Sequence, residues 1–483
     1  MKTVIHWFRR DFRLSDNTAL NAAAEAAANV VPVYILSEWK AHHHWTGPNR
    51  QEFLCGCLAA LSKNLENIGG RLIIRHGEAD AVLAQLATET GAEAIFFNRD
   101  PDPFGRAMEA RIETMAGTRG LAVHSHKDIA LHERDELRSG TGTIYRAYAP
   151  YFKTWLKQPK PPAGPRLRKL HTPADVRSEP LPTLAHWKLT SDGAKLIESG
   201  ERAARDRMRA FLSGDGGATD YAAKRSTPSG QTTSRFSQDL RWGLLSIREL
   251  YHAVRAHADE GNATVRASMD KFTGELAWRD FNMQVLYHYP NILDEEYNPA
   301  MRGIPWRRAE DHSEIFARWC EGRTGFPIVD AGMRQMAATG FMHNRLRMIT
   351  SMFLTKDLRI HWRDGESFFM QKLVDGEIAS NNGGWQWSAG TGADAAPYFR
   401  IQNPWTQSRK FDPQGDYIHE WVPELRDVPF GRLHVPLAPG GLRLENEYPS
   451  SMVDHAAERD RTLKMFRQHQ GKTPVAKTGL PVD

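Results

Sequence analysis

The sequence is poor in cysteine and lacks long apolar runs. Its 483 residues include only three cysteines, Cys55, Cys57 and Cys320. Three thiols build neither a disulfide framework nor a paired zinc-ligand spacing, so we expect a reducing, cytoplasmic setting. No stretch reaches the roughly eighteen consecutive apolar residues of a membrane helix, and we expect neither a membrane span nor export.

Common ligand motifs and a strong charge of one sign are also missing. No β-rich run is followed by a GxGxxG or Walker loop, so the sequence does not indicate a standard dinucleotide or triphosphate site. The consecutive His42, His43 and His44 cannot easily converge on one ion, so we expect a loop there and no metal. Lys and Arg number 63 against 58 Asp and Glu, a net charge of +5. This mild excess permits polyanion binding if the positive residues cluster, but it does not alone predict DNA.

What is present first is a regular alternation in the N-terminal third. Short β-rich runs alternate with Ala-rich helical patterns, and a βαβ series predicts a parallel sheet covered on both faces, with ligands at the carboxyl ends of the strands. The β-rich runs are 4–8, 30–36, 71–76, 94–98 and 121–124, and the clearest intervening helical patterns are 19–28, 51–68 and 79–90.

The composition changes after residue 150. Prolines crowd residues 159–165 and recur at Pro173, Pro180 and Pro182, which predicts an extended connector. From about residue 195 the patterns are helical, most clearly at 195–213, 246–259, 267–287, 328–339, 341–358 and 456–469. We therefore expect an α/β domain (1–130), a connector (131–195), a helical domain (196–470) and a polar tail (471–483).

The helical pattern around residue 344 carries an unusual polar face. Asn344 and Met348 are one turn apart, with Arg347 beside them and Arg345 about a quarter-circle away. A helix that packs only for stability would show an apolar stripe there, so this face suggests a lined cavity. Satisfied polar positions on a half-buried helix are the alternative interpretation.

Three further patterns fall in the helical part. Residues 232–237 gather hydroxyl groups and one guanidinium, which suits a bound phosphate, although a capped loop explains them equally well. Glu275 and Trp278 are three residues apart and would share a helix face. Trp385 and Trp387 would point in nearly opposite directions on a helix, one inward and the other to a cavity.

Taken together, these segments resemble the photolyase/cryptochrome family, most closely the class I cyclobutane pyrimidine dimer photolyases. The likeness covers almost the whole chain and rests on the motifs at 7–17, 221–225, 325–331, 342–348 and 381–387. It implies a light-driven repair enzyme that acts as a monomer on ultraviolet-damaged DNA. It also implies an α/β antenna domain followed by a helical domain that binds FAD.

The resemblance assigns residues to the cofactor. It implies an ion pair of Arg347 with Asp375 near the isoalloxazine, Asn381 beside the reactive edge of the flavin, and Glu377 near the ring. A charged pair there would help to hold reduced flavin as an anion. The segments that match the FAD phosphate region contribute Tyr221, Arg225, Thr233, Ser234, Arg235, Phe236 and Ser237.

The resemblance also assigns a lesion pocket, because a dimer must leave the DNA stack to be repaired. The two pocket tryptophans would supply ring faces, and the carboxyl and amide groups would bind the thymine edges and stabilise developing charge. The matching pocket residues are Glu275, Trp278, Asn344, Met348 and Trp387; DNA phosphates are matched by Arg279, Arg345 and Lys410, and a photoreducing chain by Trp385, Trp362 and Trp306.

Some positions depart from the family pattern. Phe341 stands where Trp is common, and Glu377 stands where Asp is expected. Residues 98–106 lack the Asn-Glu pair of some folate-binding members and look more like members with deazaflavin or a differently placed methenyltetrahydrofolate. The main alternative is a cryptochrome that senses blue light without repair, against which Asn344 and Met348 count as repair-type residues. A nucleotide-binding protein without photochemistry is the remaining alternative.

Overall fold

The computed structural model describes residues 1–37, 43–213, 217–230, 233–436 and 448–472. They form two compact units: the first contains 1–290, 336–341 and 369–380, and the second 291–335, 342–368 and the described part of 381–483. His42, Thr232 and residues 473–483 of the expected tail lie outside the described residues. None of the described helices is both long and apolar enough to span a bilayer.

The predicted parallel sheet is confirmed. All four strand pairings are parallel, in the order β3-β2-β1-β4-β5. The chain therefore moves outward from β1 to β3 and returns to place β4 beside β1, so these two strands flank the topological switch point. The strands are β1 (Thr3–Phe8), β2 (Asn29–Leu36), β3 (Ile73–His76), β4 (Ala94–Asn98) and β5 (Ala122–His126).

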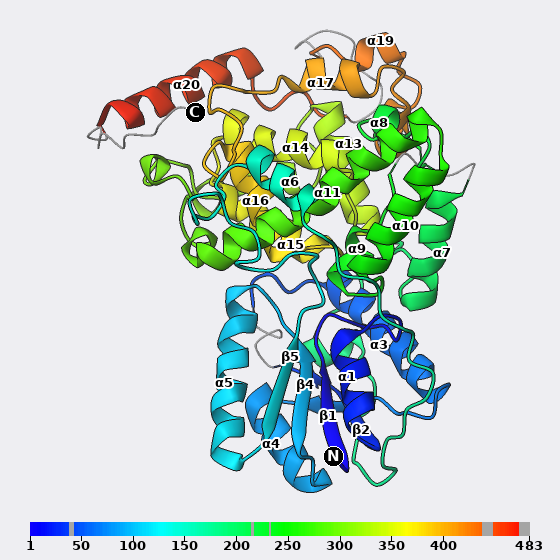
Figure 1. Cartoon of the computed structure of the whole chain (residues 1–483). Coiled ribbons are helices and arrows are strands. Elements are labelled where there is room, and N and C mark those ends of the chain that lie inside the picture. Colours follow the sequence, from blue (N-terminus) through cyan, green and yellow to red (C-terminus); the bar gives the residue numbers. More distant parts are fainter. Residues whose placement is uncertain (38–42, 214–216, 231–232, 437–447, 473–483) are drawn as a thin grey trace. The chain divides into compact units, whose positions relative to one another are not determined.

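Helices cover both faces of the sheet (Figure 1). One face packs against α4 (Ala79–Thr90) and α5 (Pro103–Arg119), where Ile5 and Val33 of the sheet share a buried cluster with Leu83. Helix α1 (Thr18–Ala26) packs on β1 and β4, and α3 (Pro48–Glu66) carries Cys57 in its buried stripe. Strands with two covered faces read as nearly continuous apolar runs, which is why the sequence located them.

The rest of the described chain is helical, apart from loops. Helices within the first unit are α6 (Tyr148–Lys157), η1 (Leu184–Trp187), α7 (Glu201–Leu212), α8 (Tyr221–Lys224), α9 (Ser237–Arg241), α10 (Ile247–Glu260) and α11 (Ala263–His288). Further along are η2 (Pro290–Leu293), η3 (Pro299–Met301), η4 (Glu310–His312), α12 (Ser313–Cys320), α13 (Pro327–Thr339), α14 (Asn344–Met352), η5 (Phe353–Asp357), α15 (Trp362–Lys372) and α16 (Ile378–Ala389). The last are α17 (Pro404–Phe411), α18 (Asp416–Trp421), η6 (Pro423–Leu425), α19 (Phe430–Leu433) and α20 (His455–Lys472).

Two helices begin later than the sequence predicts. The helix expected from 195 begins at Glu201, because Gly200 has a φ of 104° that helical backbone cannot adopt. The helix expected over 341–358 begins at Asn344, since the Nδ1 atom of His343 caps it by accepting the Arg345 N–H. That helix also changes to a π-turn at η5, so one continuous 3.6-residue period does not describe it.

The proline-rich segment is extended, as predicted. Residues 158–183 contain no helix or strand and run along the sheet domain through main-chain hydrogen bonds. The N–H of Leu167 donates to the Leu14 carbonyl at 3.1 Å, and the N–H of Val30 donates to the His171 carbonyl at 2.9 Å. The domain boundaries at residues 130, 195 and 470 stay a prediction.

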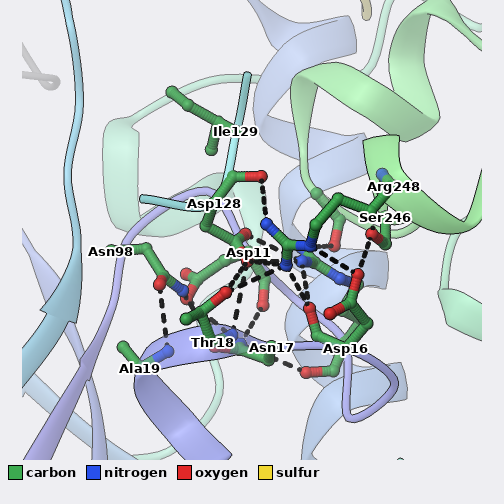
Figure 2. A network of polar contacts seen from close by, with 12 residues as sticks. Asp11, Asp16, Asn17, Thr18, Ala19, Asn98, Asp128, Ile129, Ser246 and Arg248 are labelled. Atoms are coloured by element: carbon green, nitrogen blue, oxygen red, sulfur yellow. Dashed lines mark hydrogen bonds and ion pairs between the residues drawn. The ribbon is translucent and has the colours of Figure 1, made fainter. Parts of the chain in front are cut away.

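The arginine-rich motif at 7–17 enters a buried polar network (Figure 2). The guanidinium of Arg13 donates to both carboxylate oxygens of Asp128 at 2.8 Å. Arg248, near the start of α10, bridges the carboxylates of Asp16 and Asp128, each at 2.8 Å. Residues far apart in the sequence are thus joined by paired charges that burial makes costly to separate.

A second set of contacts in the same network fixes the first helix. The side-chain amide of Asn98 donates to Asp11 at 2.6 Å and to Asn17 at 2.8 Å. Asn17 in turn caps α1 by accepting the N–H of Leu20 at 3.1 Å. This part of the motif therefore holds the fold together.

Replacing Asp128 by Asn should destabilise the protein strongly. Although burial alone would raise it, Arg13 and Arg248 lower the pKa of Asp128 to about 2. The neutral amide leaves the buried Arg13 guanidinium without its carboxylate partner, while Arg248 keeps its pair with Asp16, so we expect a loss of about 3–5 kcal/mol in the free energy of unfolding by urea at pH 7. The matched control Asp206→Asn removes an exposed pair with Arg209 and should cost less than about 1 kcal/mol.

The same carboxylate predicts an acid dependence. Because its folded-state pKa is depressed, its contribution is complete above the ordinary value of 3.8 and is lost as the pH falls toward about 2. The stability difference between wild type and Asp128→Asn should therefore shrink below pH 3.8. A difference that stays constant across that range would contradict this assignment.

Candidate functional site

In the first unit, Glu275 and Trp278 lie on one face of α11, as their spacing predicts. Glu275 forms an ion pair with Arg225, the residue that ends α8. Tyr148 stacks on Trp278 with ring centroids 3.7 Å apart and planes within 8°, and its hydroxyl donates to the Gly274 carbonyl at 2.6 Å. Tyr148 thus covers one ring face of Trp278 and holds the ring in a fixed orientation, which suits a surface on which another ring can stack.

Sequence reasoning missed Tyr148 because it lies in the stretch assigned to the connector. One signal was available there, because residues 145–152 are rich in aromatic side chains. In the structure, Tyr148 begins α6.

The phosphate-type segments of the first unit rest on aromatic packing. Tyr221 is buried, with its ring 5.2 Å from the ring of Phe272. Phe236 packs on Phe211 at 5.4 Å. Such packing fixes the backbone of α8 and α9, while Thr233 and Ser234 stay half-buried and Ser237 exposed at the start of α9.

Phe341, where the family pattern expects Trp, has a specific partner. The guanidinium of Arg235 lies 3.7 Å from the centre of the Phe341 ring, a cation–π contact. Arg235 adopts a left-handed φ of 54°, and its carbonyl accepts a hydrogen bond from Gln238. The ring at position 341 therefore helps to set the turn that leads into α9.

A buried charge cluster lies at the switch point of the sheet. Arg10, just after β1, pairs with Asp100 at 3.2 Å, with Glu377 at 3.3 Å and with Asp102 at 3.9 Å. Although burial lowers it, these carboxylates raise the pKa of Arg10 overall. Burial and the neighbouring Asp100 raise the pKa of Asp102, whereas Asp100 beside Arg10 has a lowered pKa despite its burial.

Two more arginines, both half-buried, join this cluster. Burial lowers the pKa of Arg50 to about 9 and that of Arg241 to about 10. Arg241 donates to the Gly376 carbonyl at 3.0 Å, and the nearby Asp375 carboxylate is itself 5% exposed. The sequence analysis did not identify these arginines, because nothing local marks a guanidinium as part of a charge cluster built from distant segments.

Glu377 has a structural task in addition to its predicted cofactor role. It precedes α16, and its carboxylate accepts the N–H of Ser380 at 3.0 Å. A negative charge there also complements the positive end of the helix dipole. The departure from Asp at this position thus coincides with a side chain long enough both to cap α16 and to reach Arg10.

In the second unit, α14 shows the predicted mixed face. Asn344 is exposed, and Arg347 and Met348 are half-buried. The Nε atom of Arg347 donates to the Met342 carbonyl at 2.8 Å.

Two predicted phosphate contacts share one ring. Arg345 lies 4.2 Å from the centre of the Phe411 ring, and the Lys410 ammonium lies 5.2 Å from the same ring. Arg279, by contrast, belongs to the first unit and donates to the main-chain carbonyls of Ile129 and Leu240. Its contacts favour a structural role.

The two tryptophans of α16 differ in burial. Trp385 is 2% exposed, whereas Trp387 is half-buried. Trp385 lies directly against the backbone of α15, because a Cβ atom added at Gly365 would stand 2.1 Å from the indole ring. The ring of Trp319 packs on Trp385 with centroids 6.1 Å apart.

Asn381 lies beside an unpredicted buried carboxyl group. Its side-chain amide donates to the Glu366 carbonyl at 3.2 Å, and the adjacent Asn382 donates to the Glu366 carboxylate at 3.1 Å. Burial raises the pKa of Glu366 to about 8, against the opposing hydrogen bond from Asn382. A neutral carboxyl group there can donate a hydrogen bond as well as accept one.

The two other tryptophans assigned to the photoreducing chain, Trp306 and Trp362, contact one carboxylate. The indole N–H of Trp306 donates to Oε1 of Glu296 at 3.2 Å, and that of Trp362 donates to the same oxygen at 3.3 Å. Glu296 carried no sequence signal, because it stands in a loop 66 residues from Trp362. Within the described ranges, no three His, Cys, Asp or Glu side chains are arranged to hold a metal ion.

The donor chemistry of these segments fits FAD. Hydroxyls at Thr233 and Ser234, together with guanidinium groups at Arg225 and Arg235, are the donors that a diphosphate requires. On α16, a Cβ atom added at Gly384 would meet nothing within 4 Å, so the helix has open space on that side.

Comparison with known families gives matches along both parts of the chain. A family model described as DNA photolyase matches residues 4–170. A model of the FAD binding domain of DNA photolyase matches residues 272–468. A deoxyribodipyrimidine photo-lyase from Synechococcus sp. is 38% identical over 475 residues, which cover 96% of this chain and 96% of the relative.

Two solved structures share the fold over nearly the whole chain. A class III photolyase from Agrobacterium tumefaciens superposes with a TM-score of 0.90 and 36% identity, covering 98% of both chains. A cryptochrome from Synechocystis sp. PCC6803 superposes with a TM-score of 0.87 and 28% identity, covering 96% of this chain and 99% of the other.

Replacing Gly365 by Ala should disturb the Trp385 site. The added Cβ atom overlaps the indole ring, so the ring or α15 must shift, and we expect a loss of about 1–3 kcal/mol in unfolding free energy. Gly117→Ala in α5, where a Cβ atom meets nothing within 4 Å, is the matched control and should be neutral or stabilising by up to about 1 kcal/mol. Equal urea midpoints for the two variants would contradict the close packing.

Proposed function

This chain belongs to the photolyase/cryptochrome family, and from that membership we propose that it repairs cyclobutane pyrimidine dimers in ultraviolet-damaged DNA with light. The observation that carries the proposal is the mixed face of α14, where exposed Asn344 precedes half-buried Met348 by one turn. The 38% identity to a named photo-lyase over 96% of the chain supports a photolyase enzyme. The expected likeness to class I members stays a prediction.

Reduced FAD, when bound and excited by light, supplies one electron to the dimer and receives one back. We propose that Arg347, Asp375 and Asn381 bind or face the isoalloxazine. The buried, charged Glu377 would lie near the ring. The proposed contacts to the FAD phosphates come from Tyr221, Arg225, Thr233, Ser234, Arg235, Phe236 and Ser237.

The chain's own part in repair is to hold the flipped dimer. Trp278 would stack one ring face on the dimer, and its contact with Tyr148 prevents the ring from turning away. Glu275, oriented by Arg225, accepts a hydrogen bond from a thymine edge. We propose that Asn344, Met348 and Trp387 also contact the dimer.

Positive side chains would position the DNA backbone. Arg345 and Lys410 both lie against Phe411, which keeps the guanidinium and the ammonium close together for neighbouring phosphates. Trp385, Trp362 and Trp306 form the proposed path for re-reducing oxidised FAD. We propose a monomeric, cytoplasmic enzyme with a second antenna chromophore, either a deazaflavin or methenyltetrahydrofolate.

The direct test illuminates the reduced protein with dimer-containing single-stranded and duplex DNA. Loss of the lesion in light and not in darkness is the expected result. Intact bound FAD without repair would favour a cryptochrome-type photoreceptor, the function that the likeness to the Synechocystis structure supports as second candidate. A colourless purified protein would favour nucleotide binding without photochemistry.

Glu275→Gln should weaken binding to dimer-containing DNA. The amide loses the ion pair with Arg225 and accepts hydrogen bonds less strongly, so we expect a loss of about 1–3 kcal/mol in binding free energy, measured by fluorescence anisotropy in dim red light. Binding to undamaged DNA should change little. Asp270→Asn breaks the exposed pair with Arg255 on the same helix and is the control. A parallel loss in both variants would refute a specific role for Glu275.

A further inference from the structure

Glu296 is a buried carboxylate with an unusual pair of partners. It is 5% exposed, and one oxygen accepts the indole N–H groups of both Trp306 and Trp362. Across the described ranges its carboxylate has no ion-pair partner and no other hydrogen-bond donor. A buried anion is expensive without a cation.

The backbone around Glu296 is fixed to α16. The side-chain amide of Gln386 donates to the carbonyls of Ile292 at 2.9 Å and Glu295 at 3.3 Å, and its oxygen accepts the N–H of Tyr297 at 2.8 Å. Gln386 is the immediate neighbour of Trp385. The carboxylate is therefore held in a constant position relative to α16, the helix that carries Trp385, the first tryptophan of the proposed electron-transfer path.

The nearby positive groups are already paired elsewhere or neutral. Arg302 pairs with Glu295 at 3.0 Å, and Arg363 pairs with Asp294 at 2.8 Å. Arg308 similarly pairs with Asp364 at 3.1 Å.

His361 packs against both indole rings, with centroid distances of 6.2 Å to Trp306 and 5.6 Å to Trp362. Burial, assisted by Arg308 and Arg363, lowers its pKa to about 3, so the ring is neutral near pH 7. No fixed cation therefore competes for the Glu296 carboxylate among these groups.

We propose that Glu296 stabilises positive charge on Trp362 and Trp306 and accepts the indole proton of oxidised Trp306. The inference rests on the proposed function, because light-excited oxidised FAD supplies the oxidation. Trp385 gives one electron to the FAD, Trp362 refills Trp385, and Trp306 refills Trp362. The positive charge thus moves between two indoles that share one carboxylate oxygen, so the anion need not move.

The proton step follows from the same contact. An indole radical cation is a much stronger acid than indole, and the carboxylate oxygen lies 3.2 Å from the nitrogen of Trp306. The N–H bond breaks, an O–H bond forms on Glu296, and a neutral indolyl radical remains beside a neutral carboxyl group. An electron from an external reductant, with return of the proton from Glu296, restores the starting state.

The test is flash photolysis of the oxidised, FAD-loaded enzyme, followed by transient absorption that distinguishes the cationic from the neutral tryptophan radical. In the wild type, the cation should convert to the neutral form, and D2O should slow the conversion. Glu296→Gln keeps the size of the side chain but removes its charge and basicity, so the conversion should be at least about tenfold slower. Glu296→Asp should restore part of the rate.

The control variant is Glu295→Gln, which removes the neighbouring half-buried carboxylate paired with Arg302 and should leave the conversion unchanged. Equal conversion rates in Glu296→Gln and the wild type, with bound FAD and unchanged melting, would overturn the inference. Absence of any tryptophan radical in the wild type would also overturn it. Dimer repair by chemically reduced enzyme, measured separately and expected to persist in Glu296→Gln, reports on the proposed function alone.

Discussion

The architecture of the first unit depends on the shared carboxylate of Asp128. Arg13 and Arg248 converge on it from positions 235 residues apart in the sequence, one from the loop after β1 and one from α10. Arg13 and Asp128 are both fully buried and compensate each other's charge, whereas Arg248 is compensated by Asp16 as well as by Asp128. Arg10, in the same loop, pairs with Asp100, Asp102 and Glu377. Two arginines three residues apart thus connect different parts of the fold.

This division changes how the N-terminal motif is understood. A stretch so rich in arginine suggests anion binding, yet Arg10 and Arg13 are almost fully buried and saturated by carboxylates of the chain itself. The carboxyl ends of β1 and β4, where parallel sheets often bind ligands, are occupied by internal ion pairs. In this chain, the motif therefore serves to join distant segments of the fold.

The sheet and most helices were predictable because doubly covered strands and amphipathic helices leave periodic patterns in the sequence. The partners of the site residues were not. Trp278 is braced by Tyr148 from 130 residues away, and Glu296 is joined to Trp362 across 66 residues, contacts that no local spacing encodes. The prediction of a helix over 341–358 was wrong at its start for a local reason, because His343 caps the helix and Asn344 is its first residue. The roles of the site residues were inferred from the family resemblance. The structure adds which side chains surround each of them.

The ring at position 341 has an electronic consequence. A benzene ring is far harder to oxidise than an indole, and the positive guanidinium of Arg235, 3.7 Å from the ring centre, makes removal of an electron from the ring still less favourable. Where the family pattern expects a tryptophan, this chain therefore has a ring that does not take part in electron transfer as readily. An electron vacancy is not stabilised on the Phe341 ring.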